Sequence, residues 1–138
     1  MTTGTTGALA ALSPSQLDGA EGVLLVQACG DALGVPWELG HSPIDSGCGA
    51  EAGEGFMQGG GLGPYAPGEW SDDTQMSVIV ARVAATGADL TSRPALDAIA
   101  DGFIDWYESA ASDIGAQTRA VLGAVAHHRG EPDVSARM

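Results

Sequence analysis

The sequence predicts an all-α fold, with helices packed orthogonally rather than as a regular bundle. Apolar residues recur at helical spacing around four positions, which are Val23, Val78, Ile99 and Val121. No segment alternates apolar and polar residues for long enough to indicate a strand. A Gly-rich stretch without a regular period, residues 39–69, separates the first helix from the second. Because this long connection breaks up-and-down connectivity, we expect four main helices joined irregularly.

The first helix is predicted to begin at Asp18, because Asp18 followed three residues later by Glu21 resembles a capping box. Residues 23–33 are apolar on most sides, which is typical of a helix buried on more than one face, and this predicts a buried Cys29 thiol. Three glycines lower the helix propensity, so close approach of another helix or a ligand is expected there. They are Gly22, Gly30 and Gly34.

The later helices carry start and stop signals. The second follows residues 72–73 and is predicted to end at Gly87. The third has Pro94 in its first turn, where a missing N–H costs nothing. The fourth is predicted to begin at residues 112–113 and to close at Gly130.

Length and charge limit the class of protein. The 138 residues fit one domain, and 18 acidic against five basic residues give a formal net charge of −13. This charge disfavours binding to nucleic acid or to an anionic membrane and suits cations instead. No apolar run approaches the ~20 residues of a membrane-spanning helix, and two cysteines are too few for a disulfide framework. We expect a cytoplasmic protein with a flexible tail at residues 1–17, a helical domain at 18–130 and a polar tail at 131–138.

Oxygen-bearing side chains gather where the Gly-rich stretch meets the second helix. Ser71, Asp72 and Asp73 follow one another directly. Hydroxyl and carboxylate oxygens are the ligands that hard cations such as Mg²⁺ or Mn²⁺ prefer. The same residues are favoured as helix caps and in a first turn. The junction alone leaves both interpretations open.

Three further carboxylates have two interpretations each. Asp31 lies inside the apolar first helix, and a buried carboxylate needs hydrogen-bond donors or a cation. Glu38 follows Trp37 just past the end of this helix, so it is either a solvated loop residue or a group that projects into a cleft. Asp113 is most simply the N-cap of the fourth helix, with room for a role in ligand binding.

Three motifs, in this order, resemble those of the ADP-ribosylglycohydrolase family, which includes dinitrogenase-reductase-activating glycohydrolases and J1-type crystallins. The motifs are residues 30–38 (Gly-Asp-Ala-Leu-Gly-Val-Pro-Trp-Glu), 68–76 (Gly-Glu-Trp-Ser-Asp-Asp-Thr-Gln-Met) and 113–118 (Asp-Ile-Gly-Ala-Gln-Thr). The resemblance covers residues 22–122, and the second motif is its most specific part. It implies an all-α fold, a binuclear Mg²⁺ or Mn²⁺ centre, and hydrolysis of the bond that joins ADP-ribose to a protein side chain or another acceptor.

The resemblance also implies roles for single residues. Ser71, Asp72 and Asp73 match metal ligands of the family. Glu38 matches an acidic catalytic or gating residue beside the metal, and Asp113 matches the acidic residue that faces the substrate ribose. The partners implied are an ADP-ribosylated protein or a small ADP-ribosyl substrate.

One part of the family pattern is missing from this sequence. Family members are longer, and a late Asp-x-Asp-Thr or similar motif supplies their remaining metal ligands. We therefore expect a truncated hydrolase that is inactive or weak as this chain alone, completed by a C-terminal polypeptide or derived from a longer parent. The alternative is a non-catalytic helical fragment, or a metal-binding or interaction module. Asp31 matches a recurrent helix residue with a structural or indirect role at the metal.

Overall fold

The computed structural model describes residues 12–40, 57–109 and 112–138. Four α-helices make up most of these ranges: α1 Pro14–Gly34, α2 Asp72–Ala84, α3 Arg93–Glu108 and α4 Ala116–Val125. Three short 3-10 helices accompany them: η1 Val35–Gly40, η2 Ala126–His128 and η3 Val134–Arg137. The β pairing in these ranges is a single isolated bridge between Gly60 and Tyr65. The prediction of an all-α fold is confirmed.

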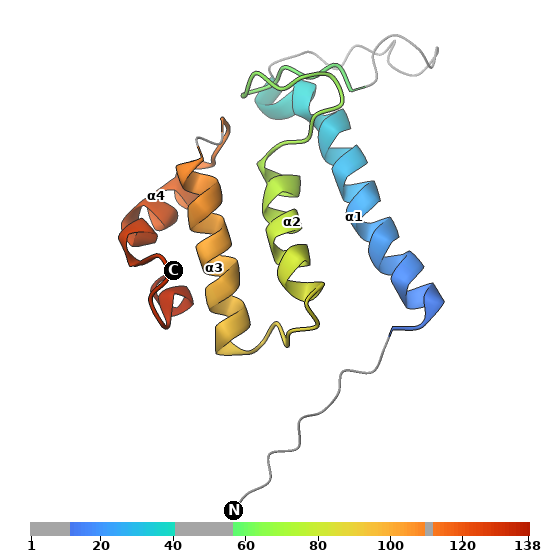
Figure 1. Ribbon diagram of the computed structural model, residues 1–138. Helices are drawn as coiled ribbons and strands as arrows, with labels where there is room; N and C mark the ends of the chain where they lie inside the picture. The colour runs from blue at the N-terminus through green and yellow to red at the C-terminus, as the bar shows by residue number, and fades with distance from the viewer. Residues whose placement is uncertain (1–11, 41–56, 110–111) are drawn as a thin grey trace, which may run out of the picture.

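The helices α1, α2 and α3 lie side by side, and α4 lies on the far side of α3 from α2 (Figure 1). Helices α2 and α3 approach closely at Gly102, where a Cβ atom would lie 2.5 Å from Cγ2 of Ile79. Helix α1 meets α2 near its C-terminal end and leans away from it toward its N-terminal end (Figure 1). At the upper end in this view, η1 and the loop before α2 cover the place where α1 and α2 converge.

The core lies between α3, α4 and the C-terminal segment. Ile104 and Val134 are fully buried there. The cluster of buried residues is Ala100, Ile104, Trp106, Ile114, Leu122, Val125 and Val134. Met76 and Ile79 of α2 pack against it as partly buried residues. The core thus fixes α2, α3 and α4 to one another, while α1 stays outside it.

Helix α1 begins earlier than predicted. Its N-cap is Ser13, whose hydroxyl accepts from the Gln16 amide while the Gln16 side chain accepts from the Ser13 amide. Pro14 at the first helical position adds a backbone angle that is already helical. This Ser13–Gln16 capping box replaces the one predicted at Asp18, so residues 13–17 are not part of a flexible tail.

Helix α1 is also far more exposed than predicted. Residues 23–26 are apolar, yet their exposed fractions run from 39% to 73%. The Cys29 thiol is free and exposed. Added Cβ atoms at Gly22, Gly30 and Gly34 would meet no atom within 4 Å, so no helix approaches closely there. The reason is that α1 packs chiefly on α2 and η1, and the other described elements leave its remaining sides to solvent.

The start and end of the later helices differ slightly from prediction. Helix α2 ends at Ala84, and Gly87 closes the following turn at φ +76° by donating its N–H to the Ala84 carbonyl. Helix α4 begins at Ala116 with Gly115 at the N-cap position, three residues later than predicted. No helix in the described ranges is both long and apolar enough to cross a membrane.

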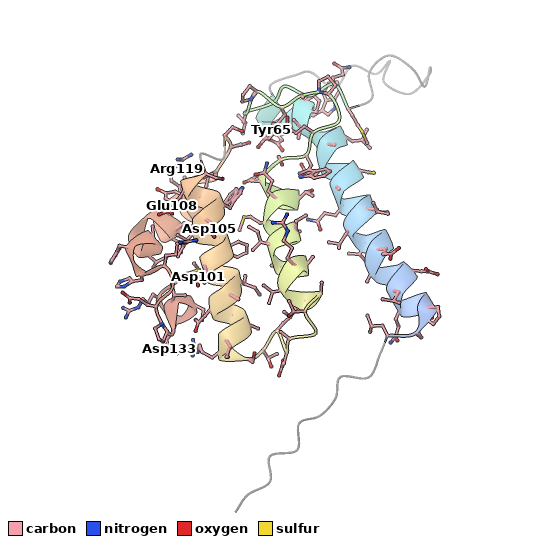
Figure 2. The ribbon with its side chains drawn as sticks, viewed as in Figure 1. Tyr65, Asp101, Asp105, Glu108, Arg119 and Asp133 are labelled. Atoms are coloured by element: carbon pink, nitrogen blue, oxygen red, sulfur yellow. The ribbon has the colours of Figure 1, made fainter. Side chains whose placement is uncertain are left out.

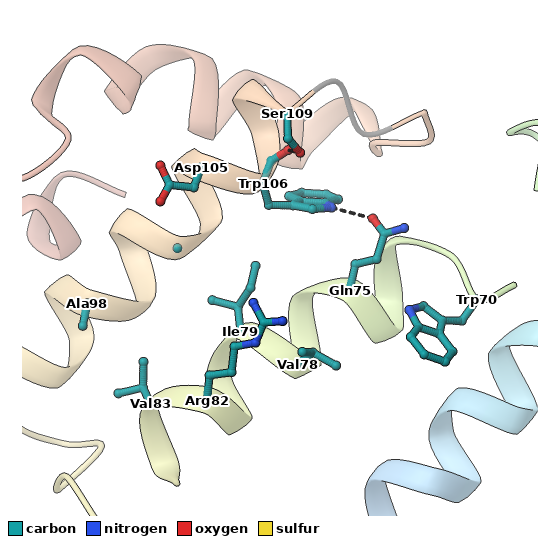
Figure 3. A pocket seen from close by; sticks show the side chains of 11 residues that line it. Trp70, Gln75, Val78, Ile79, Arg82, Val83, Ala98, Asp105, Trp106 and Ser109 are labelled. Atoms are coloured by element: carbon teal, nitrogen blue, oxygen red, sulfur yellow. Dashed lines mark hydrogen bonds between the residues drawn. The ribbon is translucent and has the colours of Figure 1, made fainter. Parts of the chain in front are cut away.

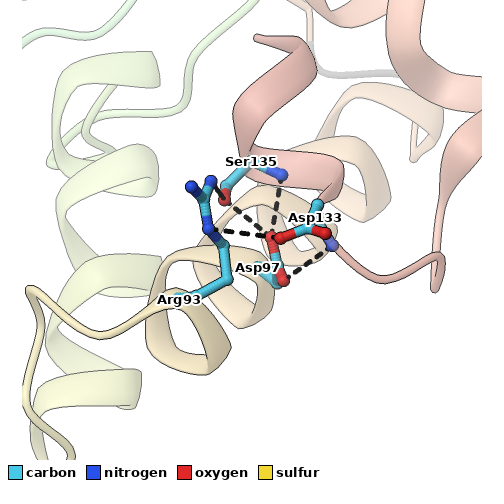
Figure 4. A network of polar contacts seen from close by, with 4 residues as sticks. All are labelled: Arg93, Asp97, Asp133 and Ser135. Atoms are coloured by element: carbon cyan, nitrogen blue, oxygen red, sulfur yellow. Dashed lines mark hydrogen bonds and ion pairs between the residues drawn. The ribbon is translucent and has the colours of Figure 1, made fainter.

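Residues 131–138, predicted to be a polar tail, pack on α3 instead. Val134 inserts into the core, and three aspartates spaced one turn apart on α3 contact the segment around it, two through backbone amides and one through an arginine side chain. Asp97 accepts from the Asp133 and Ser135 amides at 3.0 and 2.9 Å (Figure 4). The other two contacts are those of Asp101 with the Gly130 amide and of Asp105 with Arg129. Figure 2 labels Asp101 and Asp105 on α3. We call Asp97, Asp101 and Asp105 the aspartate ladder.

Candidate functional site

Asp31 of α1 caps the start of α2. Its carboxylate accepts from the Ser71 amide at 3.0 Å, the Ser71 hydroxyl at 2.6 Å and the Thr74 amide at 3.1 Å. Amides in the first turn of a helix have no acceptor within the helix, and here a carboxylate from another helix supplies one. Burial acts to raise the pKa of Asp31, but these hydrogen bonds outweigh it and hold the pKa below its usual value. Asp31 therefore has the donors that its position in the sequence required.

Ser71 does not cap its own helix. It occupies the N-cap position of α2, yet its side chain makes no capping hydrogen bond there and is fully buried. Asp72 and Asp73 follow in the first turn, with Asp72 half-buried and Asp73 exposed. A first-turn carboxylate is favoured by the helix dipole, so this interpretation still holds for both aspartates. The Thr74 hydroxyl is buried close enough to Asp31 to help lower the pKa of that carboxylate, although it forms no hydrogen bond of good geometry in the described part of the chain.

A cavity of about 360 Å³ opens between the end of α1, η1 and the start of α2. Its lining residues are Gln27, Gly30, Asp31, Gly34, Glu38 and Asp73. The 3-10 helix η1 continues directly from α1 and carries Glu38 to this space. Gly30 and Gly34 contribute no side chain, and this keeps the cavity open. Glu38 and Asp73, 35 positions apart, thus line one space.

The carboxylates around this cavity act on one another through their charge. Burial raises the pKa of Glu38, and the negative charges of Asp113, Asp72, Asp31 and Asp73 raise it further, in that order. Burial also raises the pKa of Asp72, and the charges of Asp113 and Asp73 add to the effect. The charge of Asp113 therefore contributes to the raised pKa values of both Glu38 and Asp72, after the larger effect of burial.

Asp113 is not the N-cap of α4. That position belongs to Gly115, and no side chain caps this helix. Asp113 is instead half-buried at the end of the connection from α3. It does not line the cavity beside Glu38, and neither does Asp72. Asp113 and Asp72 act on Glu38 through their negative charge.

Tyr65 is a further residue of this site, and it was not predicted from the sequence. Its side chain is buried, in the loop that lies over η1 (Figure 2). Burial raises its pKa, and the charges of Asp113, Asp72 and Glu38 raise it further, against an opposing effect of the Ser112 hydroxyl. The signal available in the sequence was its place directly after the Gly-rich run, where the chain can fold tightly. Gly59 and Gly61 adopt φ of +72° and +69° there.

The order and content of these motifs can be compared with known families. A family model described as ADP-ribosylglycohydrolase matches residues 12–137. The chain belongs to the ADP-ribosylglycohydrolase family. Comparisons with curated proteins and with solved structures found no match. ADP-ribosylglycohydrolases act on ADP-ribosylated substrates and typically bind Mg²⁺. The all-helical fold agrees with this family.

The donor atoms of the site fit the Mg²⁺ of an ADP-ribosylglycohydrolase in kind. They are carboxylate and hydroxyl oxygens, which a hard cation prefers, and neighbouring negative charges help to raise the pKa values of Glu38 and Asp72, an effect that a bound cation would relieve. The buried Thr74 hydroxyl beside them has hydrogen-bonding capacity to spare. The number of metal-ligating side chains at the site is small, however. Within the described ranges no three His, Cys, Asp or Glu side chains are grouped closely enough to hold a metal ion.

Proposed function

We propose that this chain forms part of the active site of a metal-dependent hydrolase that removes ADP-ribose from a modified protein side chain or another ADP-ribosyl acceptor. Ser71, Asp72 and Asp73 would hold Mg²⁺ or Mn²⁺, while Glu38 and Asp113 would act on the substrate. The observation that carries the proposal is that Glu38 of η1 and Asp73 of α2 line one cavity. The charges of Asp113 and Asp72 add to the effect of burial in raising the pKa of Glu38, which supports a shared site. Capping alone would not bring them together.

The residues of the chain have distinct tasks in this proposal. A bound divalent cation would supply charge that orients a ribose hydroxyl and polarises a water molecule. Glu38, whose pKa is raised, suits proton transfer at the glycosidic bond, since a useful acid or base has a pKa nearer to the working pH. Asp113 would accept hydrogen bonds from the ribose. Asp31 would hold the Ser71 hydroxyl in place without touching the substrate.

We further propose that the chain by itself turns over little. Ser71, Asp72 and Asp73 offer at most about half of the six oxygens that a hard divalent cation takes, and water completes the shell without fixing a second ion. A complementing polypeptide that brings further carboxylates would raise the activity. The sparse grouping of carboxylates also favours a second candidate, a helical interaction module of the family that binds Mg²⁺ weakly and does not hydrolyse its substrate.

The first prediction separates these two candidates. We expect slow, Mg²⁺-dependent release of ADP-ribose from an ADP-ribosylated peptide, measured by chromatography. Asp72→Asn combined with Asp73→Asn should abolish it, and should also abolish the local component of Mg²⁺ binding in calorimetry. The matched control is Asp18→Asn combined with Glu108→Gln, which removes the same two charges from exposed positions away from the site.

Each result has a definite meaning. Release that survives both the double site variant and a chelator would exclude the proposed metal site. Local Mg²⁺ binding without release would support the interaction module instead. Equal Mg²⁺ binding by the site variant and the control would show that the cations associate only diffusely with the acidic surface, as a charge of −13 permits.

A further inference from the structure

A groove of about 560 Å³ runs between α2 and α3 (Figure 3). The side chains of Val78, Ile79 and Val83 give it an apolar lining, and Trp70 at its rim is 43% exposed. Arg82, in the last turn of α2, also lines it. Asp105 is the other charged residue of the lining. An apolar groove with few charged groups is the form of site that receives an amphipathic helix.

Two of the five arginines, Arg82 and Arg119, form no ion pair within the described ranges, and of these two only Arg82 lines the groove. Arg93, Arg129 and Arg137 each pair with an acidic side chain. Arg82 is exposed and forms no ion pair within the described ranges. The acidic residue that lines the same groove, Asp105, is already engaged by Arg129. The groove therefore suits an occupant that offers an apolar stripe with a carboxylate in it.

Such a stripe exists on α1 of the same chain. Leu17, Glu21, Leu24 and Leu25 occupy positions i, i+4, i+7 and i+8, which share one face of a helix. The three leucines are 48%, 39% and 65% exposed. Glu21 is exposed and makes no ion pair in the described part of the chain. This leucine stripe carries an acidic residue between its leucines, and the groove carries a basic residue, Arg82, in its lining.

We propose that α1 of a second copy of this chain seats its leucine stripe in the groove between α2 and α3, with Glu21 opposite Arg82. The α1 helix of the same copy does not reach this groove, because α1 and α3 lie on opposite sides of α2 (Figure 1). When α1 of each copy binds in the groove of the other, both grooves are occupied and both leucine stripes are covered. The result is a closed dimer with twofold symmetry. This inference goes beyond the proposed catalysis and does not depend on it.

Charge sets the conditions under which the pair forms. Two copies with a net charge of −13 each repel one another at long range, and salt screens this repulsion over about 8 Å at physiological ionic strength. The contact between Arg82 and Glu21 acts at short range, within an apolar surrounding. Association is therefore best measured in about 0.15 M salt, where long-range repulsion is damped.

The test is a charge-swap cycle followed by analytical ultracentrifugation from about 1 to about 200 µM chain, a range in which mass action moves a micromolar equilibrium. The wild-type chain should shift from 13.8 kDa to twice that mass as concentration rises. Arg82→Glu and Glu21→Arg should each raise the dissociation constant at least about tenfold. The two together restore the opposite charges, so the constant should return to within about threefold of wild type.

Two further variants serve as controls for this test. Arg119→Glu makes the same charge change on α4, outside the groove, and should leave association unchanged within about twofold. Leu25→Ser removes a largely exposed leucine, so it should weaken association without unfolding the chain, as helical circular dichroism would verify. A chain that stays monomeric over the whole range would overturn the proposal. So would an Arg82→Glu variant that behaves like Arg119→Glu, or a double variant as weak as the singles combined.

Discussion

At the scale of single residues, Asp31 joins two parts of the site. Its carboxylate satisfies two first-turn amides of α2 and the buried Ser71 hydroxyl, although it belongs to α1. The position of the proposed ligands Asp72 and Asp73 relative to Glu38 thus depends on a side chain that touches none of them in these contacts. Asp31 is best understood as a positioning residue.

Asp31→Ala should lower the free energy of unfolding by about 1–3 kcal/mol, because it leaves two helix-start amides and a buried hydroxyl without their acceptor. Urea unfolding followed by circular dichroism measures this loss. The matched control is Asp18→Ala in the same helix, which is exposed and should change stability by less than about 0.5 kcal/mol. Equal losses in the two variants would show that the cap contributes nothing.

Sequence reasoning reached part of this arrangement. A carboxylate in the apolar segment of α1 needs hydrogen-bond donors or a cation, and in the structure Asp31 accepts hydrogen bonds. Which donors it found could not be known, since Ser71 lies 40 positions away. Tyr65 was missed for a related reason. Its proximity to Asp113 and Glu38 is created by folding, and no spacing in the sequence encodes it.

At the scale of elements, the aspartate ladder shows how α3 holds a segment that has little secondary structure of its own. Val134 supplies the apolar anchor, and the ladder supplies acceptors for the surrounding backbone amides. The Ser135 hydroxyl and amide, the Asp133 amide and the Arg93 charge together hold the pKa of Asp97 below its usual value, although burial acts against them.

The pH dependence of this attachment follows from that direction. Because the folded pKa of Asp97 is depressed, its contacts are fully formed above the unfolded pKa of about 3.9 and are lost as pH falls through the lower folded value. We expect the amide signal of Ser135 in NMR to keep its folded position from pH 7 to pH 5 and to move below about pH 4.

The matched variants make this prediction local. Asp97→Asn should shift the Ser135 signal already at neutral pH. Asp89→Asn should not, although the pKa of Asp89 is also lowered, because its hydrogen-bond partner is Thr91 and not Ser135. A Ser135 signal unaffected by Asp97→Asn would mean that Val134 alone holds the segment.

The sequence predicted the positions of the helices better than it predicted which of their faces are buried. The apolar periods around Val78, Ile99 and Val121 correspond to α2, α3 and α4. For α1, the all-round apolar pattern predicted burial, and the structure leaves residues 23–26 exposed. An apolar pattern indicates which side chains of a helix could be buried. What covers it depends on the other elements present, and those described here reach only one side of α1.

At the scale of the whole molecule, net charge dominates the long-range energetics. With 18 acidic and five basic residues, like-charge repulsion opposes the compact state. The ion pairs Arg93–Asp133 and Arg129–Asp105 oppose it only weakly, because their side chains are about half exposed. The same surplus of carboxylates suits the proposed cation site and disfavours binding to nucleic acid.

Raising NaCl from about 10 mM to about 200 mM should therefore stabilise the chain by roughly 1 kcal/mol, since unit charges 4 Å apart in water repel by about 1 kcal/mol and salt screens the more distant pairs. Urea unfolding at about 1 µM chain, where mass action disfavours association, measures the effect on the folded monomer. A fall in stability with salt would show instead that surface ion pairs outweigh the net repulsion.

The trans cap on α2 has a consequence for how the chain tolerates change. Asp31 and Ser71 are 40 positions apart, so the helix start is completed only when the loop between them closes. The entropy of closing a flexible loop grows with the logarithm of its length, and doubling the length costs only about 0.6 kcal/mol. Three hydrogen bonds at the cap exceed that cost. We therefore expect residues inserted between η1 and α2 to cost little stability, as long as Asp31 still accepts hydrogen bonds from Ser71 and Thr74.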